Sequence, residues 1–313
     1  MTVIGHGYDD NVGAPAFRNV IINGGMKVAQ YGTSFSYASG GGTRYYPADR
    51  FNVENYVWSA GSNPTVSNDT TVYPPGGFRN SIKYQVGATG LTFSSGGWQS
   101  IMHRVEGYNI AHLYSSTVTL SFWVRSSVTG TYGVTFANDW WGTGSPTRMY
   151  IAEYTINAAN TWEKKTITTS LATATTSYLA GVQLEAGSVA TPFEFEPYET
   201  TLRKCQRYYF RWTPGPYGTI GIAPSYSTTG ARLHMQLPVV MRATPTGITT
   251  GGSSFYQLPN GGGVVNCTLS NDRFNNLSIL IGVTSTSMTA GGASMITGNQ
   301  DGTSWIEVNG AEL

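Results

Sequence analysis

The chain has 313 residues, which is enough for two domains of ordinary size. Charged residues make up only 11% of it and the net charge is +1, which excludes the clustered Lys and Arg of a nucleic-acid binder. The 39 Gly, 14 Pro and 20 Tyr favour many short strands joined by tight turns and argue against a helical bundle.

The chain opens with a segment that carries no strand pattern. Its first residues, MTVIGHGYDD, lack the basic start and the apolar run of a secretory signal. The longest apolar runs, such as residues 277–283, are too short to span a bilayer. We therefore interpret residues 1–20 as an arm that precedes the first domain, and we expect neither signal-peptide export nor membrane insertion.

Most of the remaining chain alternates apolar and polar residues with the period of a β-strand. Clusters of Gly and Pro separate these runs and are typical of turns. Many short strands at such a spacing indicate a β-sandwich, and the jelly roll is the commonest large form of it. The clearest runs cover residues 81–86, 118–124, 132–136, 150–156, 232–237 and 277–283.

One segment follows a helical period instead. Leu202, Cys205, Gln206 and Tyr209 recur at i, i+3, i+4 and i+7, and Thr200 or Thr201 precedes them as a cap. This pattern predicts a short helical turn over residues 201–209, between two strand-rich regions. We therefore predict an all-β protein with an N-terminal jelly-roll β-sandwich over residues 21–200 and a smaller C-terminal β-domain over residues 201–313.

Residues for metal or nucleophilic chemistry are scarce. Cys205 and Cys267 match no zinc or redox spacing, which favours two buried free thiols and leaves a disulfide between them open. The four histidines are scattered, and no Gly-x-Ser-x-Gly motif accompanies them. We expect no metal site and no cofactor, while His234 lies on the polar side of its strand. The histidines are His6, His103, His112 and His234.

A family resemblance enters with residues 181–209, GVQLEAGSVATPFEFEPYETTLRKCQRYY. This stretch resembles a signature of bacteriophage and prophage tail-fibre and appendage proteins. There a final jelly-roll strand runs through a Gly-Ser turn and an apolar-acidic stretch into a CQRYY element. Further segments resemble the same family in the same order: residues 23–35, 46–51, 103–108, 118–127, 158–163 and 237–246.

The resemblance implies a jelly roll like those of carbohydrate-binding modules, followed by a smaller β-domain, on the surface of a phage particle. It further implies a homotrimer, and an N-terminal arm that docks to other virion proteins. A virion protein is assembled in the host cytoplasm and released by lysis, which agrees with the missing signal peptide.

Glycoside hydrolysis needs two facing carboxylates roughly 5 to 10 Å apart. The nearest approaches to such a pair are Asp9-Asp10, Glu194 with Glu196, and Asp139 with Glu153 across a hairpin. We interpret all of them as solvated or salt-bridged side chains and predict no catalytic residue.

Exposed aromatic rings are the stronger signal, because sugar rings stack on them. Trp140 and Trp141 follow Asp139 in a Gly-rich loop, and at most one of two adjacent strand residues can face a core. Ligand contact, a subunit interface and local packing all stay open for them. Trp98 is a weaker candidate, and Tyr226 with Arg232 is predicted at an exposed tip of the C-terminal domain.

The sequence therefore favours a phage surface protein that recognises a host polysaccharide without cleaving it. A structural virion component, such as a capsid decoration or a tail adaptor, is the second hypothesis. A glycan depolymerase is the third.

Overall fold

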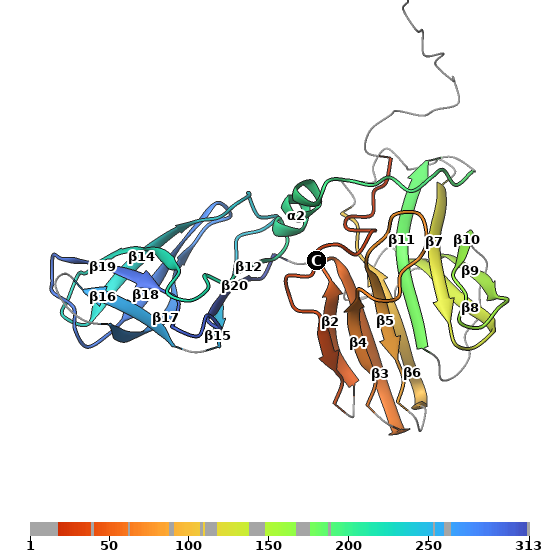
Figure 1. The fold of residues 1–313 in the computed structure, drawn as a ribbon, viewed down its shortest axis with the longest axis horizontal. Helices are drawn as coiled ribbons and strands as arrows, with labels where there is room; N and C mark the ends of the chain where they lie inside the picture. The colour runs from red at the N-terminus through yellow and green to blue at the C-terminus, as the bar shows by residue number, and fades with distance from the viewer. Residues whose placement is uncertain are drawn as a thin grey trace, which may run out of the picture. The chain divides into compact units, whose positions relative to one another are not determined.

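The computed structural model describes residues 18–38, 41–61, 63–87, 91–106, 109, 118–137, 148–166, 176–186, 189–252, 254–259 and 264–311. The contacts within the chain divide it into two compact units, Met1–Tyr198 and Glu199–Leu313. This division falls next to the domain boundary predicted after residue 200. Almost every element is a strand (Figure 1), so the predicted all-β fold is confirmed.

The first unit is a β-sandwich in which consecutive strands move back and forth between facing sheets, as in a jelly roll. One sheet has the order β1-β4-β5-β11-β7-β10, and β2-β3-β6 and β8-β9 form two smaller sheets. The strands are β1 (Ser34–Ser36), β2 (Gly41–Ala48), β3 (Phe51–Gly61), β4 (Thr65–Asp69), β5 (Ser81–Gln85), β6 (Leu91–His103), β7 (Val118–Ser126), β8 (Gly130–Ala137), β9 (Arg148–Ile156), β10 (Glu163–Thr166) and β11 (Thr176–Ala186).

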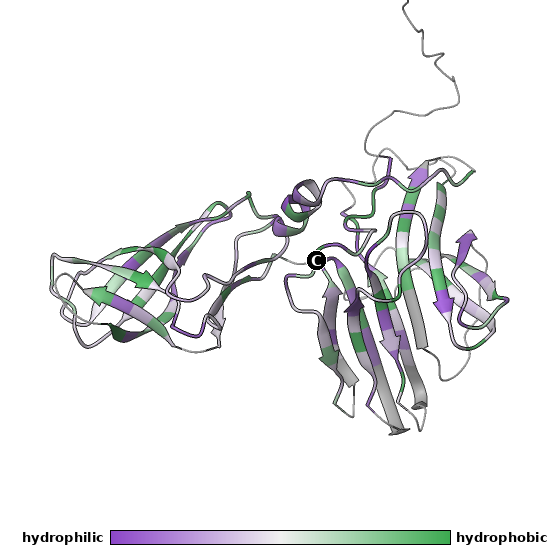
Figure 2. Ribbon diagram, in the orientation of Figure 1, coloured by the Kyte–Doolittle hydropathy of each residue, from purple (hydrophilic) through white to green (hydrophobic). Residues whose placement is uncertain are grey.

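Alternate residues of these strands form the core of the first unit. Phe122 and Val124 of β7 are buried between the sheets, and Val53 of β3 reaches the same core from the other side. The hydropathy colouring in Figure 2 changes in bands along β7 accordingly. The strands predicted over residues 81–86, 118–124, 132–136 and 150–156 are therefore confirmed as β5, β7, β8 and β9.

The motif that follows β11 has a packing role within the first unit. Phe193 and Phe195 pack against Phe78, with ring centroids 5.0 and 4.9 Å from its ring. Phe78 in turn lies against Gly181, where β11 carries a bulge and φ is +60°. A β-carbon at Gly181 would lie 2.7 Å from Phe78 and 3.0 Å from Trp123. Trp123 of β7 thus lies close to Gly181.

The second unit begins with the helix α2 (Tyr198–Gln206) and continues as strands. The predicted helix is confirmed, but it starts and ends three residues earlier than expected. Pro197 stands just before it, where proline is favoured, and the Cys205 carbonyl closes the end by accepting from two backbone amides. The strands are β12 (Phe210–Trp212), β13 (Thr219–Pro224), β14 (Gly230–Gln236), β15 (Gly247–Gly251), β16 (Phe255–Pro259), β17 (Val265–Phe274), β18 (Ser278–Thr284), β19 (Ala293–Thr297) and β20 (Trp305–Asn309).

Six of these strands form one sheet with the order β13-β19-β16-β17-β18-β14. A bridge between Ser225 and Ala231 also joins β13 to β14, so the two ends of the sheet meet. Leu233, Ile281 and Ile296 fill its interior, and the sheet β12-β20-β15 adds Ile306 and Val308 to the same core. The runs predicted over residues 232–237 and 277–283 are confirmed as β14 and β18.

Both cysteines are buried free thiols. Burial raises the pKa of Cys267 to about 12, which leaves its thiol protonated and inert at neutral pH. In the part of the chain that the structure describes, no helix has the length and apolar character needed to cross a bilayer.

We predict that Gly181→Ala lowers the free energy of unfolding of the first unit by about 3 kcal/mol. The new β-carbon combines a left-handed backbone with a collision against Phe78 and Trp123. Urea unfolding followed by tryptophan fluorescence measures this loss. Gly76→Ala is the matched control, because Gly76 also has a positive φ but nothing within 4 Å, and it should cost only about 1 kcal/mol. Equal losses in both variants would contradict the packing role.

Candidate binding face of the second unit

The candidate site lies on the outer face of three neighbouring strands, β14, β18 and β17 (Figure 1). Leu233 and Met235 of β14 point into the core, so Arg232 and His234 point outward. On β18, Ile281 and Val283 are buried, which places Gly282 on the outer side. The face thus combines charged side chains with a bare position in its central strand.

A glycine allows an ion pair to cross that central strand. Arg232 of β14 is opposite Gly282 of β18, and Gly282 is opposite Ser270 of β17. A β-carbon at Gly282 would lie 2.7 Å from the Ser270 hydroxyl. Because this position is bare, the Arg232 side chain reaches over β18, and its Nε donates to Oδ2 of Asp272 at 2.5 Å. The hydrogen bond that Arg232 donates to Asp272 raises the pKa of Arg232.

A bulge in β17 brings a second arginine to the same side. The register shifts between Asn271 and Arg273, so Asp272 is an extra residue in the strand. Arg273 is opposite the outward-facing Leu280 of β18, and its Nε is 3.7 Å from Oδ1 of Asp272. The bulge therefore places two successive side chains on one face, as bulges near binding sites do.

The aromatic part of the site is Tyr226, in the turn between β13 and β14. Its ring passes over Gly230, where a β-carbon would lie 2.6 Å from the ring, and the guanidinium of Arg232 lies 4.8 Å from the ring centroid. The turn is fixed because the amides of Tyr226 and Ser227 both donate to the Gly230 carbonyl. Tyr226 is nevertheless 61% exposed, so much of the ring is open to a ligand.

Tyr226, Arg232, Asp272 and Arg273 together are called the Tyr226 site below. Backbone hydrogen bonds hold the turn that carries Tyr226. Its exposed ring therefore offers a surface for stacking at little cost in conformational entropy. The arginines supply donors and the aspartate supplies acceptors beside it. This combination of one open ring with polar groups fixed around it suits a hydroxyl-rich ring such as a sugar.

Of the residues predicted from sequence, the structure brings Tyr226 and Arg232 together. Asp139, Trp140 and Trp141 lie outside the described residues, so their role stays a prediction. Trp98 belongs to the first unit, on β6 opposite Tyr56 of β3. The role of Trp98 as a ligand contact is likewise still a prediction.

The face of the first unit that carries Trp98 is polar and largely buried. Trp98 is half-buried and already engaged in a contact. On the same side of the sheet, Nε of Arg44 is 3.2 Å from Oε2 of the buried Glu54. Asn52 is buried nearby, and neither polar atom of its amide has a hydrogen-bond partner. Trp98 is thus less exposed than Tyr226, which is 61% exposed.

Sequence reasoning missed Asp272, Arg273 and Gly282. A bulge cannot be recognised from one sequence, because it depends on how β17 pairs with β18. The two adjacent charged residues within a strand pattern were the only available signal. In a chain with 11% charged residues, that signal was informative.

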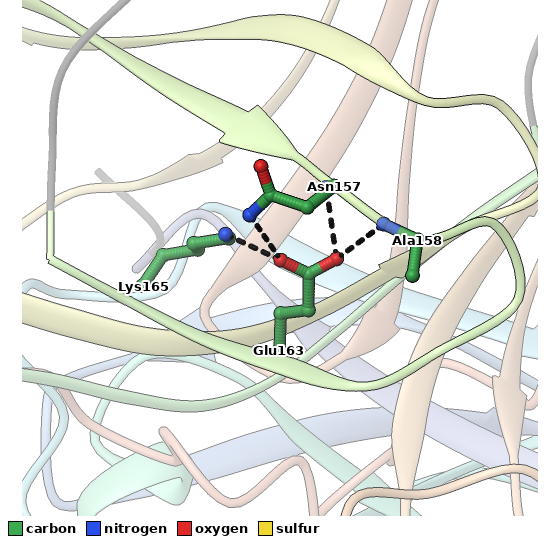
Figure 3. Close-up of polar contacts among 4 residues, drawn as sticks. All are labelled: Asn157, Ala158, Glu163 and Lys165. Atoms are coloured by element: carbon green, nitrogen blue, oxygen red, sulfur yellow. Dashed lines mark hydrogen bonds and ion pairs between the residues drawn. The ribbon is translucent and has the colours of Figure 1, made fainter.

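Several of the described carboxylates accept hydrogen bonds that stabilise the fold. Glu163 accepts from the backbone amides of Asn157 and Ala158 at 3.0 Å and from the side chains of Asn157 and Lys165 at 3.0 and 2.5 Å (Figure 3). Burial opposes the charge, but these hydrogen bonds lower the pKa of Glu163 to about 2. A general acid needs a raised pKa, so Glu163 does not suit that role.

Other described acids are held in the same way by hydrogen bonds or ion pairs. The carboxylate of Glu185 accepts from the backbone amide and the hydroxyl of Thr191, at 2.8 and 2.6 Å. Glu194 accepts from the backbone amide of Asn19 at 3.0 Å. The other acids that accept hydrogen bonds or form ion pairs in this way include Asp49, Glu54, Asp69, Glu106, Asp301 and Glu307.

The histidines offer no catalytic arrangement among the described residues. Burial, with a smaller effect of the Arg50 charge, lowers the pKa of His103 to about 3, and its Nε2 is 3.1 Å from the Ile22 carbonyl. It is therefore neutral and structural. No group of three or more His, Cys, Asp or Glu lies close enough to hold a metal ion in the described ranges.

Comparison with known proteins gives little beyond this geometry. No protein-family model and no curated protein matches the chain. Among the solved structures that are similar is the N-terminal CBM22-1-CBM22-2 tandem domain from Paenibacillus barcinonensis Xyn10C, with 12% identity and a TM-score of 0.24. The match covers 88% of this chain and 98% of that one. A TM-score this low does not establish a common fold or a shared ligand.

We predict that Glu163→Gln destabilises the first unit by about 1–2 kcal/mol at pH 7, because the charge-assisted hydrogen bonds are lost. The pKa of Glu163 is lowered in the folded state, so the stabilisation is present above pH 4.5 and is lost as the pH falls toward 2. Urea unfolding at pH 7, 5, 4 and 3 should show the difference from the native protein shrinking below pH 4.5. A difference that stays constant over this range would contradict the assignment.

Proposed function

We propose that this protein is a phage surface protein of the tail-fibre or receptor-binding type that recognises host glycans without cleaving them. The observation that carries the binding half of the proposal is the Tyr226 site. There an exposed ring is fixed beside Arg232 and Asp272 on an otherwise hydroxyl-bearing face. The phage half rests on the resemblance of residues 181–209 and the segments around them.

A non-cleaving function fits the chemistry of the site. Its single carboxylate, Asp272, is paired with Arg232 at 2.5 Å and lies 3.7 Å from Arg273. Hydrolysis by a carboxylate pair would need a second acid facing it, and β14, β17 and β18 carry no other acidic residue.

The proposal includes a homotrimer and an N-terminal arm that attaches to other virion proteins. A single open ring with a few polar groups is a weak site. Several copies on one particle convert weak contacts into firm attachment, because each later contact is made at high effective concentration. Host polysaccharide is therefore the expected partner of the Tyr226 site, and the virion is the expected location.

A second candidate is a structural virion component, and one surface of the second unit favours it. The strands β13, β19 and β16 contain no charged residue. Ile222 of β13 is opposite Met295 of β19, which is opposite Leu258 of β16, and Ile222 is 65% exposed. Tyr217 stacks on Tyr256 with ring centroids 6.1 Å apart. This uncharged face suits contact with another protein surface.

We predict that Tyr226→Ala weakens binding to host polysaccharide about tenfold, since stacking on one aromatic ring contributes roughly 1–2 kcal/mol. Isothermal titration calorimetry with polysaccharide extracted from host cells measures the change. Tyr217→Ala is the matched control, because Tyr217 is a 50% exposed tyrosine of the same unit that lies on the uncharged face. A native protein that binds no host polysaccharide, or equal losses in both variants, would overturn the proposal.

The ring position can be tested without removing the ring. Gly230→Ala places a methyl group 2.6 Å from the Tyr226 ring, so the ring must move away from its position over residue 230. We expect the far-ultraviolet circular dichroism to stay native and the affinity to fall several-fold, toward that of Tyr226→Ala. Native affinity in a folded Gly230→Ala protein would show that the placement of the ring is unimportant.

The non-cleaving part and the location have their own tests. Incubation of the protein with host polysaccharide should release no new reducing ends, and their appearance would favour a depolymerase. Immunogold labelling of intact virions should show the second unit at the particle surface. Labelling that appears only after the particles are disrupted would favour the structural component instead.

A further inference from the structure

We propose that the Tyr226 site selects acidic saccharides and that Arg273 is the residue that contacts their anionic group. This inference rests on the proposed glycan-binding function and narrows it to one class of ligand. Its basis is the distribution of charge on the outer face of β14, β18 and β17, and the different ways in which the two arginines are held.

Positive charge predominates on this face. Two arginines and one aspartate are the charged residues of its three strands, and the outward-facing His234 is a further titratable side chain on the face. Arg232, His234 and Arg273 are all exposed. A face with an excess of positive charge favours an anionic ligand over a neutral one.

The two arginines have different roles because Asp272 binds them unequally. Arg232 is committed to Asp272 at 2.5 Å and lies against the Tyr226 ring. Arg273 approaches Asp272 only to 3.7 Å, which is beyond hydrogen-bond distance, and its side chain is 73% exposed. Asp272 is thus paired mainly with Arg232. The guanidinium of Arg273 keeps donors that point to solvent.

The chemistry of the exposed Arg273 guanidinium defines the class of ligand. Its planar array of N–H donors matches a carboxylate or a phosphate with two parallel hydrogen bonds, which a neutral hydroxyl cannot offer. The neighbouring ring provides a stacking surface for the sugar that bears this group. The ligand class is therefore a saccharide with an oxyanion, supplied by a uronic-type carboxylate or by a sugar phosphate.

Nucleic acid also combines rings with anions, but this face suits it poorly. Binding a polyphosphate chain depends on many Lys and Arg contacts, and these strands provide two arginines and no lysine. Ser270, Thr268 and Thr284 supply hydroxyls on the same face instead. These hydroxyl groups both donate hydrogen bonds to sugar hydroxyls and accept hydrogen bonds from them.

The test is a binding survey of the full-length protein against purified bacterial capsular and O-antigen polysaccharides. Each carboxylate-bearing member is paired with its carboxyl-reduced, neutral form, and each phosphate-bearing member with its dephosphorylated form. A single-stranded oligonucleotide is included. We expect at least tenfold tighter binding to the acidic member of one kind of pair, which also identifies the oxyanion, and a steep loss of affinity with added salt.

Variants assign the effect to one residue. Arg273→Gln should lower the affinity for the acidic form at least tenfold and bring the ratio of the affinities for the acidic and neutral forms close to one. Arg203→Gln is the matched control, because it removes the same charge from the exposed part of α2. The far-ultraviolet circular dichroism of both variants should be native.

The outcomes separate the two proposals. Equal binding to acidic and neutral forms, or equal effects of Arg273→Gln and Arg203→Gln, would overturn the inference and leave glycan binding intact. Tighter binding to the oligonucleotide than to any polysaccharide would overturn the assigned ligand class. Binding to no polysaccharide at all would overturn the proposed function itself.

Discussion

Strands β14 and β18 of the second unit bury one side only, and this constraint determines what the other side can carry. In β14, the burial of Leu233 and Met235 forces Arg232 and His234 outward. Because side chains alternate strictly along a strand, the apolar residues that stabilise the core also orient the polar residues of the candidate site. The Tyr226 site is thus a direct consequence of how the core is formed, with Gly230, Gly282 and the β17 bulge adjusting its shape.

A low content of charge gives each charged group a large effect. Glu163 and Glu185 hold turns by accepting several hydrogen bonds each, and Asp272 fixes Arg232 over Tyr226. Carboxylates employed in this way stabilise the fold and are poorly placed for acid–base catalysis. Arg273 differs from these groups, because the neighbouring Asp272 is hydrogen-bonded to Arg232 instead. The second unit has a charged face on β14, β18 and β17 and an uncharged face on β13, β19 and β16.

The sequence predicted the class of fold, six of the strands and two of the four residues of the Tyr226 site. Alternation identified β5, β7, β8, β9, β14 and β18, and the helical period identified α2 to within three residues. Tyr226 and Arg232 were recognised as exposed because both lie outside the apolar pattern. The motif over residues 181–209 was recognisable before its physical role was known, which is to seat Phe78 against Gly181 and to pack Phe193 and Phe195 over it.

What the sequence by itself determined was local: which residues alternate, where turns interrupt them, and how little charge is available for nucleic-acid or acid–base chemistry. Only the tertiary structure decided which strands are neighbours, and so which distant residues meet. Arg232 and Asp272 are forty positions apart and touch because β18 lies between their strands and carries a glycine where they cross. Strand pairing and bulges depend on cooperation among several strands at once, and no single segment of sequence encodes that cooperation.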